Sequence, residues 1–221
     1  MKLCALSIGY SNSAPILNAI DAELLKGELV ALIGRNGTGK STLLRTMARL
    51  LPPLSGNIIG ATPAIVLSTT PDLRNTTVRQ MVAYGRLPYT GFFGRLHERD
   101  IQVANEAMSA IGIEALADRL FCGLSDGEKQ KVMIARALAQ DTSTMLLDEP
   151  SAFLDYPSRL QLMEQLQNLA HNQQKAILLS THDLELAQRF ADRIWLIRQG
   201  ELLTDIIPSS FDVEQALLAT T

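Results

Sequence analysis

The feature that most constrains this chain is the segment Gly34–Ser41, GRNGTGKS, which fits the pattern G-x-x-x-x-G-K-[ST]. A short apolar run, Leu29–Ile33, precedes it, and Lys40–Leu51 follows with the apolar spacing of a helix. In a strand, loop and helix of this kind, backbone N–H groups turn inward around phosphate oxygens and the helix dipole favours the anion. We therefore predict that Lys40 reaches the β- and γ-phosphates and that the Ser41 hydroxyl ligates Mg²⁺. The alternative, an ordinary glycine-rich turn with a surface lysine, is disfavoured by this context.

Composition excludes several classes of protein. The chain has 221 residues, a length that predicts one elaborated domain, and 47% of them are hydrophobic, too many for a disordered chain. The net charge of −3 argues against a nucleic-acid partner. Because no run of about 18 apolar residues occurs, we expect no membrane-spanning segment. The two cysteines, Cys4 and Cys122, lack metal-ligand spacing and favour a reducing compartment.

Strand and helix patterns alternate along the chain, which predicts an α/β fold. Further strands are predicted at 1–5, 64–67, 145–147, 176–180 and 193–198, the last leading through Gln199-Gly200 into an antiparallel hairpin with 201–203. Helices are predicted at 100–111, 125–140, 157–172 and 184–191. The stretch 51–56 reads as a turn, and 84–96 reads as a loop-rich surface because of its glycines and proline.

Polar side chains end three of the predicted parallel strands. Asp148 follows a buried strand, as a carboxylate must to hold Mg²⁺ beside the phosphate loop, and Glu149 follows where it can polarise water. His182 ends the next strand and leaves the same edge of the sheet. Taken alone, each could be a strand entering a polar loop or a solvated histidine. Together with the phosphate loop, they predict a nucleotide site.

A fourth segment, Leu124–Glu128, precedes a predicted helix, with Ser125 as N-cap and Glu128 completing a capping box. With this segment the chain resembles the ATP-binding cassette (ABC) ATPase family, whose signature Leu-Ser-Gly-Gly-Gln is matched at Leu124, Ser125 and Gly127. The order of motifs along the chain also matches. The resemblance implies a P-loop NTPase fold with a mainly parallel core sheet, a reduced antiparallel β-subdomain, and a helical subdomain of about 72–140 within a single domain.

The resemblance also implies a head-to-tail homodimer that binds two ATP molecules with Mg²⁺, each between the phosphate loop of one subunit and the signature of the other. Tyr10 would stack on adenine, and Ser125 and the Gly127 backbone would touch the γ-phosphate in trans. Glu149 is similar to the catalytic base, and His182 to the residue that senses the γ-phosphate. The implied nucleotide ligands within the subunit are Tyr10, Gly34, Arg35, Asn36, Gly37, Thr38, Gly39, Lys40, Ser41 and Thr42, with Ser41 and Asp148 on the metal and Asp155 coupling the two sites.

Within this family, Val82–Tyr89 and the following aromatic segment resemble the ATPases of importers for iron-siderophores, haem and cobalamin. The implied function is an ATPase that powers uptake through partner permease subunits, indirectly served by a substrate-binding protein. Such a subunit works at the cytoplasmic face of the inner membrane, as a peripheral protein. Alternatives are a non-transport ABC ATPase and a poorly hydrolysing nucleotide switch. The absence of a second cassette or a heptad run disfavours the first, and Lys40, Asp148, Glu149 and His182 together disfavour the second.

Three departures from the family pattern stand out. Ser68 and Thr69 occupy the place of a glutamine that links the γ-phosphate and metal to the permease, and neither has its reach. Asp126 and Glu128 replace a glycine and the glutamine of the signature, and we expect Asp126 to point away from the phosphate. The chain between Gly56 and Ala64 is short, as though two strands of the β-subdomain were missing.

Overall fold

A six-stranded sheet forms the centre of the computed structural model, which describes residues 1–11, 13–91 and 94–210. Its strands lie in the order β5-β6-β7-β3-β8-β9, parallel except for β9, which pairs antiparallel with β8. The bounds are β3 Leu29–Ile33, β5 Ala64–Val66, β6 Thr144–Asp148, β7 Ala176–Ser180, β8 Arg193–Arg198 and β9 Glu201–Ile206. The predicted α/β fold is confirmed, and the carboxyl ends of β3, β6 and β7 meet at one edge.

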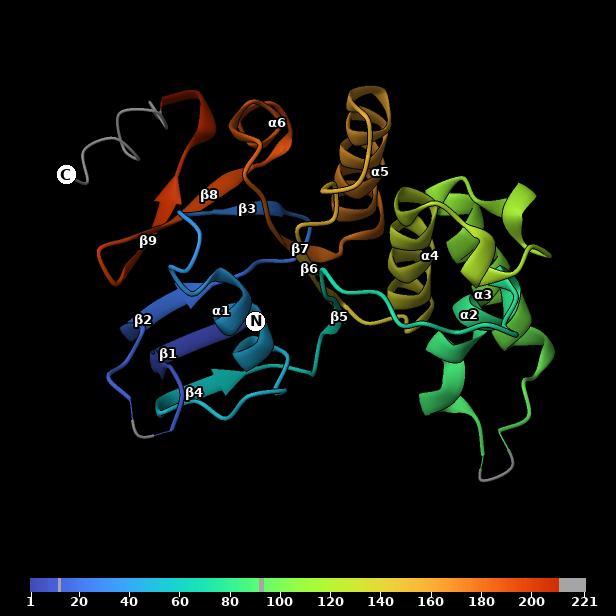
Figure 1. Ribbon diagram of the computed structural model, residues 1–221. Helices are drawn as coiled ribbons and strands as arrows, with labels where there is room; N and C mark the ends of the chain where they lie inside the picture. The colour runs from blue at the N-terminus through green and yellow to red at the C-terminus, as the bar shows by residue number, and fades with distance from the viewer. Residues whose placement is uncertain (12, 92–93, 211–221) are drawn as a thin grey trace.

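A smaller antiparallel sheet covers one face of the core sheet together with helix α1, on the left in Figure 1. It contains β1 (Lys2–Ile8), β2 (Leu17–Glu23) and β4 (Ser55–Ile59) in the order β2-β1-β4. Alternate core-strand residues such as Leu146 and Leu178 point toward this layer, as expected from the period of two in a strand. The predicted antiparallel β-subdomain is therefore present, with three strands among the described residues.

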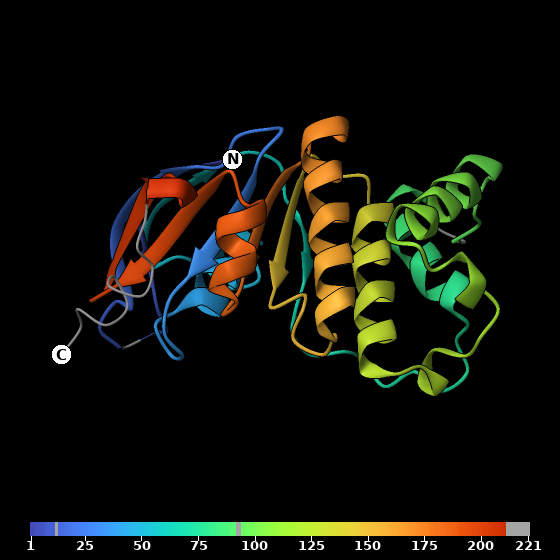
Figure 2. The ribbon, with the colours of Figure 1, turned by 90° about the horizontal axis from the view of Figure 1, so that it is seen from above.

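Helices cover the opposite face (Figure 2). They are α2 (Val78–Ala83), α3 (Glu98–Ile111), α4 (Asp126–Ala139) and α5 (Tyr156–Gln173), while α6 (Leu184–Phe190) packs beside β3. The core residues Leu147 and Leu179 pack among α2–α5, so strand neighbours face opposite layers. In the described part of the chain, short 3₁₀ turns also lie at 114–116, 121–123 and 208–210, besides the 3₁₀ segment Tyr84–Tyr89. No helix within the described ranges is long and apolar enough to span a bilayer.

The segment Tyr84–Tyr89 is a 3₁₀ helix, which corrects the prediction of an irregular loop beginning at Tyr84. The buried Arg86 fixes it: Nε lies 3.0 Å from Asp100 Oδ1, and Nη1 donates to Ala139 O at 2.9 Å. The Tyr89 ring lies under the guanidinium at 3.9 Å, and its hydroxyl donates to Gln140 O. These contacts join α3 and α4 to a segment whose own sequence carries no helical periodicity.

Several boundaries differ from the predictions, and two of these differences have a clear reason. Helix α1 spans Lys40–Met47 rather than extending to Leu51, because Arg49 adopts the left-handed conformation and the Leu50 and Leu51 N–H groups turn back to Arg45 O. The turn predicted at 51–56 is likewise shorter, since β4 begins at Ser55. At Ser55 the backbone already pairs with Ser7 of β1.

Candidate functional site

The phosphate loop joins β3 to α1 in a backbone conformation that glycine permits. Gly37 and Gly39 have φ of 80° and 104°, in the left-handed region that residues with a Cβ rarely adopt. A Cβ on Gly39 would also lie 2.6 Å from Ile16 Cγ2, so the loop touches the β1–β2 connection. The N-terminus of α1 therefore points its free N–H groups into the space that the loop encloses.

Lys40 lies under this loop with its ammonium group turned toward backbone oxygens. Its Nζ donates to Gly34 O at 2.7 Å and to Arg35 O at 3.2 Å, and only 6% of the residue is exposed. Burial lowers the pKa of the ammonium, while the nearby carboxylates of Glu149 and Asp148 oppose that shift. An ammonium group held by two neutral carbonyl oxygens can exchange them for charged phosphate oxygens, which it binds more strongly.

The loop borders a cavity of about 280 Å³. It is lined by Tyr10, Ile16, Asn36, Gly37, Gly39, Lys40, Ser41, Thr42 and Glu149. Six of these nine were predicted nucleotide ligands in the loop and α1, and Tyr10 lies at the rim with its side chain half exposed. Gly34, Arg35 and Thr38 lie in the same loop outside the lining, where Thr38 Oγ1 donates to Arg35 O. The structure thus brings most of the predicted nucleotide residues together around one cavity.

Asp148, the last residue of β6, is buried with 1% exposed, and its two oxygens differ. Oδ1 accepts a hydrogen bond of 2.8 Å from the Ser180 hydroxyl at the end of β7, whereas Oδ2 has no partner. A buried carboxylate oxygen without a partner costs free energy unless a cation or donor reaches it. One oxygen of Asp148 is therefore held by the protein and the other remains available.

This arrangement fits Mg²⁺. The ion prefers a few protein oxygens together with phosphates and water, and the free Asp148 Oδ2 and the Ser41 hydroxyl are oxygen donors of that kind. Among the described residues, no group of three His, Cys, Asp or Glu side chains gathers to form a self-sufficient metal cage. A metal that depends on the bound phosphates for its remaining ligands agrees with this donor set.

Glu149 follows Asp148 with its backbone in the left-handed region, at φ 51°. Its N–H donates to Ser180 Oγ at 2.9 Å, and its Oε1 lies 2.6 Å from His182 Nε2. A residue with a Cβ adopts this φ at a cost, and such strain persists where neighbouring contacts fix it. Glu149, the predicted base, therefore contacts His182, the predicted γ-phosphate sensor, and Glu149 also lines the cavity of the phosphate loop.

The signature segment lies in a different place. Ser125 caps α4 with the predicted capping box, in which Ser125 Oγ accepts from Glu128 N at 3.3 Å and Glu128 Oε2 accepts from Ser125 N at 2.8 Å. This N–H bond lowers the pKa of Glu128. Asp126 is largely exposed and lies 3.4 Å from Lys129 Nζ, as a residue turned to the solvent side of the helix would.

Gly127 packs against the loop after β6, where a Cβ would lie 2.8 Å from Leu154 Cδ2. The signature borders a second cavity of about 350 Å³, which also contains Asp155. Its lining residues are Ser125, Gly127, Glu128, Lys131, Phe153, Leu154, Asp155 and Ser158. The two cavities share no lining residue, so the signature does not border the cavity of the phosphate loop in the same chain.

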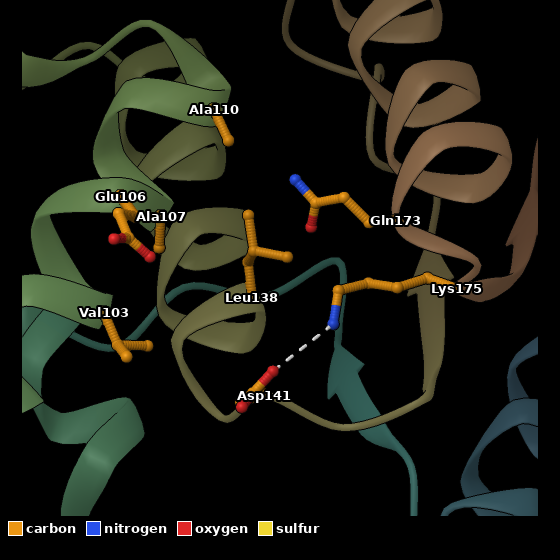
Figure 3. A pocket seen from close by; sticks show the side chains of 8 residues that line it. All are labelled: Val103, Glu106, Ala107, Ala110, Leu138, Asp141, Gln173 and Lys175. Carbon is orange, nitrogen blue, oxygen red and sulfur yellow. Dashed lines mark ion pairs between the residues drawn. The ribbon is translucent and has the colours of Figure 1, made fainter. Parts of the chain in front are cut away.

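A third cavity, of about 90 Å³, lies between α3, α4 and the start of β7 (Figure 3). Lys175 reaches into it, 3.8 Å from Asp141, with its Nζ donating to Thr142 O and its pKa lowered by burial. Lys175 precedes the amino end of β7, whereas the phosphate loop follows the carboxyl end of β3. This cavity is therefore at the wrong edge of the sheet, and too small, for a nucleotide.

Ser68 and Thr69 follow β5, which pairs with β6 beside the site, and Ser68 is half-buried while Thr69 is exposed. Two residues at the site were missed by sequence reasoning. In the sequence, Ser180 is only the end of an apolar run, and Ile16 has no periodic context. The pairing of Asp148 with Ser180 across two parallel strands could have been found only from the register of the sheet.

Comparison with known proteins places this geometry in a family. The sequence model of the family described as "ABC transporter" matches residues 17–152. An uncharacterized ABC transporter ATP-binding protein of Methanocaldococcus jannaschii is 40% identical over 217 residues, covering 92% of this chain and 74% of the relative. The achromobactin transport ATP-binding protein of Dickeya dadantii is 37% identical, over 97% of this chain and 84% of the relative. The iron(3+)-hydroxamate import ATP-binding protein of Bacillus subtilis is 34% identical, over 90% and 79%.

Solved structures give the same result. A protein described as a metal-chelate type ABC transporter, in an inward-facing conformation, superimposes with a TM-score of 0.89 and 26% identity, covering 99% of this chain and 88% of that one. A bacterial ABC transporter cassette solved as a dimer superimposes with a TM-score of 0.78 and 25% identity, over 91% and 95%. The agreement extends over nearly the whole chain.

Proposed function

The chain belongs to the ABC transporter family, and we propose that it is the ATP-hydrolysing subunit of an importer for an iron-siderophore, haem or cobalamin-type substrate. The observation that carries the catalytic part is the Glu149–His182 pair, 2.6 Å apart beside the phosphate-loop cavity. The relatives named for achromobactin transport and iron(3+)-hydroxamate import support the class of cargo, as does a cobalamin import ATP-binding protein of Halobacterium salinarum that is 35% identical to this chain.

In this mechanism the phosphate loop binds the nucleotide and Lys40 faces the β- and γ-phosphates. Lys40 gives up its bonds to Gly34 O and Arg35 O and neutralises charge on the phosphates. Tyr10, at the rim of the cavity, stacks on the adenine. Ser41 and the free Oδ2 of Asp148 would hold Mg²⁺, which would supply charge stabilisation to the transferring phosphoryl group.

Glu149 is the base. Its carboxylate takes a proton from the water that attacks the γ-phosphorus. The bond between the γ-phosphorus and the β–γ bridging oxygen breaks, and ADP is the leaving group. His182 holds Oε1 of Glu149 in this structure. When His182 turns to the γ-phosphate it releases that oxygen, so the same movement that senses ATP frees the proton acceptor.

Two copies of the chain complete the site. Because the signature cavity is separate from the phosphate-loop cavity, Ser125 and the Gly127 backbone reach the γ-phosphate only from a second subunit. Asp155 lies in the signature cavity and couples the two sites. A solved relative of this fold is a dimer, which supports a head-to-tail homodimer.

The membrane partner docks on the helical side of the molecule. Tyr84, Leu87 and Tyr89 expose 41–52% of their surface on the 3₁₀ helix that Arg86 fixes. Apolar side chains on a rigid segment provide a surface for permease subunits, which would hold the chain at the cytoplasmic face of the inner membrane. A separate substrate-binding protein would deliver the cargo.

The test is Glu149→Gln. The amide keeps the shape of the side chain but accepts no proton, so ATP binding should persist while turnover falls by about 100-fold or more. With ATP and Mg²⁺ the variant should elute as a dimer in size-exclusion chromatography. Glu201→Gln, at an exposed position on β9, is the control and should keep wild-type turnover. Turnover unchanged in Glu149→Gln, or a strictly monomeric profile with ATP, would contradict the proposal.

A further inference from the structure

Ser180 occupies an unusual position for a small hydroxyl side chain. It is the last residue of β7, is fully buried, and pairs in register with Asp148 on β6. Its Oγ donates to Asp148 Oδ1 at 2.8 Å and accepts from Glu149 N at 2.9 Å. One hydroxyl therefore bonds both to the carboxylate proposed to hold the metal and to the backbone of the proposed base.

The bond to Asp148 decides which carboxylate oxygen is free. With Oδ1 occupied by the Ser180 proton, the carboxyl plane is fixed and the unpartnered Oδ2 becomes the oxygen presented to a cation. Without the hydroxyl, both oxygens of a buried carboxylate would lack a donor. The group could then rotate, and neither oxygen would have a fixed direction.

The bond to Glu149 holds a strained backbone. Glu149 has φ 51°, and its N–H points to Ser180 Oγ while its side chain contacts His182, two residues further along the same strand exit. Both contacts come from the end of β7, so this strand fixes the direction in which the Glu149 carboxylate leaves the chain. Loss of the N–H bond would let the backbone relax toward a negative φ and swing the carboxylate away from the cavity.

We propose that Ser180 is a positioning residue for ATP hydrolysis, which orients the metal-binding oxygen of Asp148 and the carboxylate of Glu149 through one hydroxyl. The inference rests on the roles proposed above for those two residues. In this proposal Ser180 itself contacts neither substrate nor metal. Its loss acts through Asp148 and Glu149.

The alternative is that Ser180 only stabilises the fold, and the chain contains a matched control for that possibility. Ser7 on β1 is also buried, donates to a side-chain oxygen, Asn18 Oδ1, at 2.6 Å, and accepts from the N–H of Ala19 at 3.2 Å. Ala19 also has a positive φ, of 48°. Ser7→Ala therefore removes one donated and one accepted bond beside a similar backbone conformation, in the antiparallel sheet and with a neutral amide in place of the carboxylate.

The experiment compares the full chain with Ser180→Ala, Ser180→Thr, Ser7→Ala and Glu149→Gln. Three quantities are measured: kcat and KM for ATP, the Mg²⁺ concentration that half-saturates binding of a fluorescent ATP analogue, and the melting temperature. Ser180→Ala should lower kcat by about 10- to 100-fold, the range for residues that orient metal ligands, with KM within about threefold. It should also raise the half-saturating Mg²⁺ concentration by about 10-fold or more, a readout that needs no turnover. Ser7→Ala should leave kcat and the Mg²⁺ dependence within about twofold of wild type while lowering the melting temperature.

Ser180→Thr retains the hydroxyl and should restore kcat to within about threefold of wild type. If the added methyl prevents folding, the Mg²⁺ dependence of Ser180→Ala still decides between a positioning role and a purely structural role for Ser180. Equal kcat and Mg²⁺ dependence in Ser180→Ala and Ser7→Ala would overturn the positioning role. Full turnover in Glu149→Gln would instead overturn the assignment of the base, whatever Ser180→Ala does, so the two failures are distinguishable.

Discussion

Asp148 at the strand ends and Arg86 on the helical side are both buried charged residues, but their polar contacts differ. At the strand ends, Asp148 keeps one buried oxygen without a partner. On the helical side, the buried Arg86 contacts Asp100, Ala139 O and the Tyr89 ring. The free oxygen of Asp148 can receive a cation, whereas the charge of Arg86 is used in contacts that hold the 3₁₀ helix in place. The difference predicts that changes at the first region alter binding and chemistry, and that changes at the second alter stability.

The largest expected effect follows from the cation at the strand-end site. Lys40→Ala removes the ammonium group that faces the phosphates, so ATP affinity should fall by about 100-fold, because a charge-assisted contact to phosphate is lost. Isothermal titration with ATP measures the change. Lys26→Ala, at an exposed position, should bind as wild type does. Unchanged ATP affinity in Lys40→Ala would mean that the phosphate loop is not part of the nucleotide site.

The reverse pattern is expected for Arg86. Arg86→Met leaves Asp100 buried without its cation, which should lower the melting temperature by about 5–10 °C while basal turnover of the folded protein stays within about twofold of wild type. The double variant Arg86→Met/Asp100→Leu should recover much of the loss, because no unpaired charge remains. A fall in basal turnover well beyond about twofold, with little change in the melting temperature, would mean that the two regions are not separate.

The third prediction concerns the loop that would connect the two regions. If the hydroxyls of Ser68 and Thr69 are poor substitutes for a glutamine, stimulation of ATP hydrolysis by permease and loaded binding protein should be weak in wild type. Ser68→Gln or Thr69→Gln should strengthen it by about fivefold, equivalent to a coupling free energy of about 1 kcal/mol. Reconstituted vesicles provide the measurement, with Thr62→Gln on the exposed β4–β5 turn as control. Strong wild-type stimulation that neither substitution alters would assign the coupling to another residue.

The smallest effect is a dependence of stability on pH. The His97 N–H, and then Arg86, hold the pKa of Asp100 below its ordinary value of 3.8. Because the folded pKa is the lower one, the stabilisation is complete above about pH 5 and is lost as the pH falls through the folded value. The difference in denaturant midpoint between wild type and Asp100→Asn should therefore shrink from pH 7 to pH 3. Glu98→Gln, at an exposed acid on the same first turn of α3, should show no such trend. A difference that stayed constant with pH would contradict the role of the Asp100 charge.

The sequence was most informative where local pattern and chemistry coincide. The strands Leu29–Ile33 and Ala176–Ser180 were predicted with their observed bounds, since a continuous apolar run ending in polar residues describes a buried parallel strand. The capping box at Ser125 was also predicted, because its two partners are three residues apart. Lys40 and Ser41 were predicted from the phosphate-loop motif, and both line the cavity, because this motif determines the local backbone and the chemistry together.

What the sequence did not predict depends on pairs that are distant along the chain. Ser180 meets Asp148 from 32 residues away, through the register of two strands. Arg86 and Asp100 are 14 residues apart, across a break between two helices, so no periodicity joins them. The 3₁₀ helix at Tyr84–Tyr89 is set by that pair rather than by local propensity, which explains why its glycine and proline were read as a loop.

The short connection between β4 and β5 has a practical consequence for labelling this protein. Residues 60–62 are exposed, and β4 is an edge strand of its sheet. The residues of the β-subdomain that line the nucleotide cavity are Tyr10 and Ile16, in the connection between β1 and β2. Exposed turns of this kind accept inserted peptides more readily than buried ones. A fluorophore or affinity tag inserted after Ala61 would therefore report on the protein in a membrane preparation while leaving its ATP site intact.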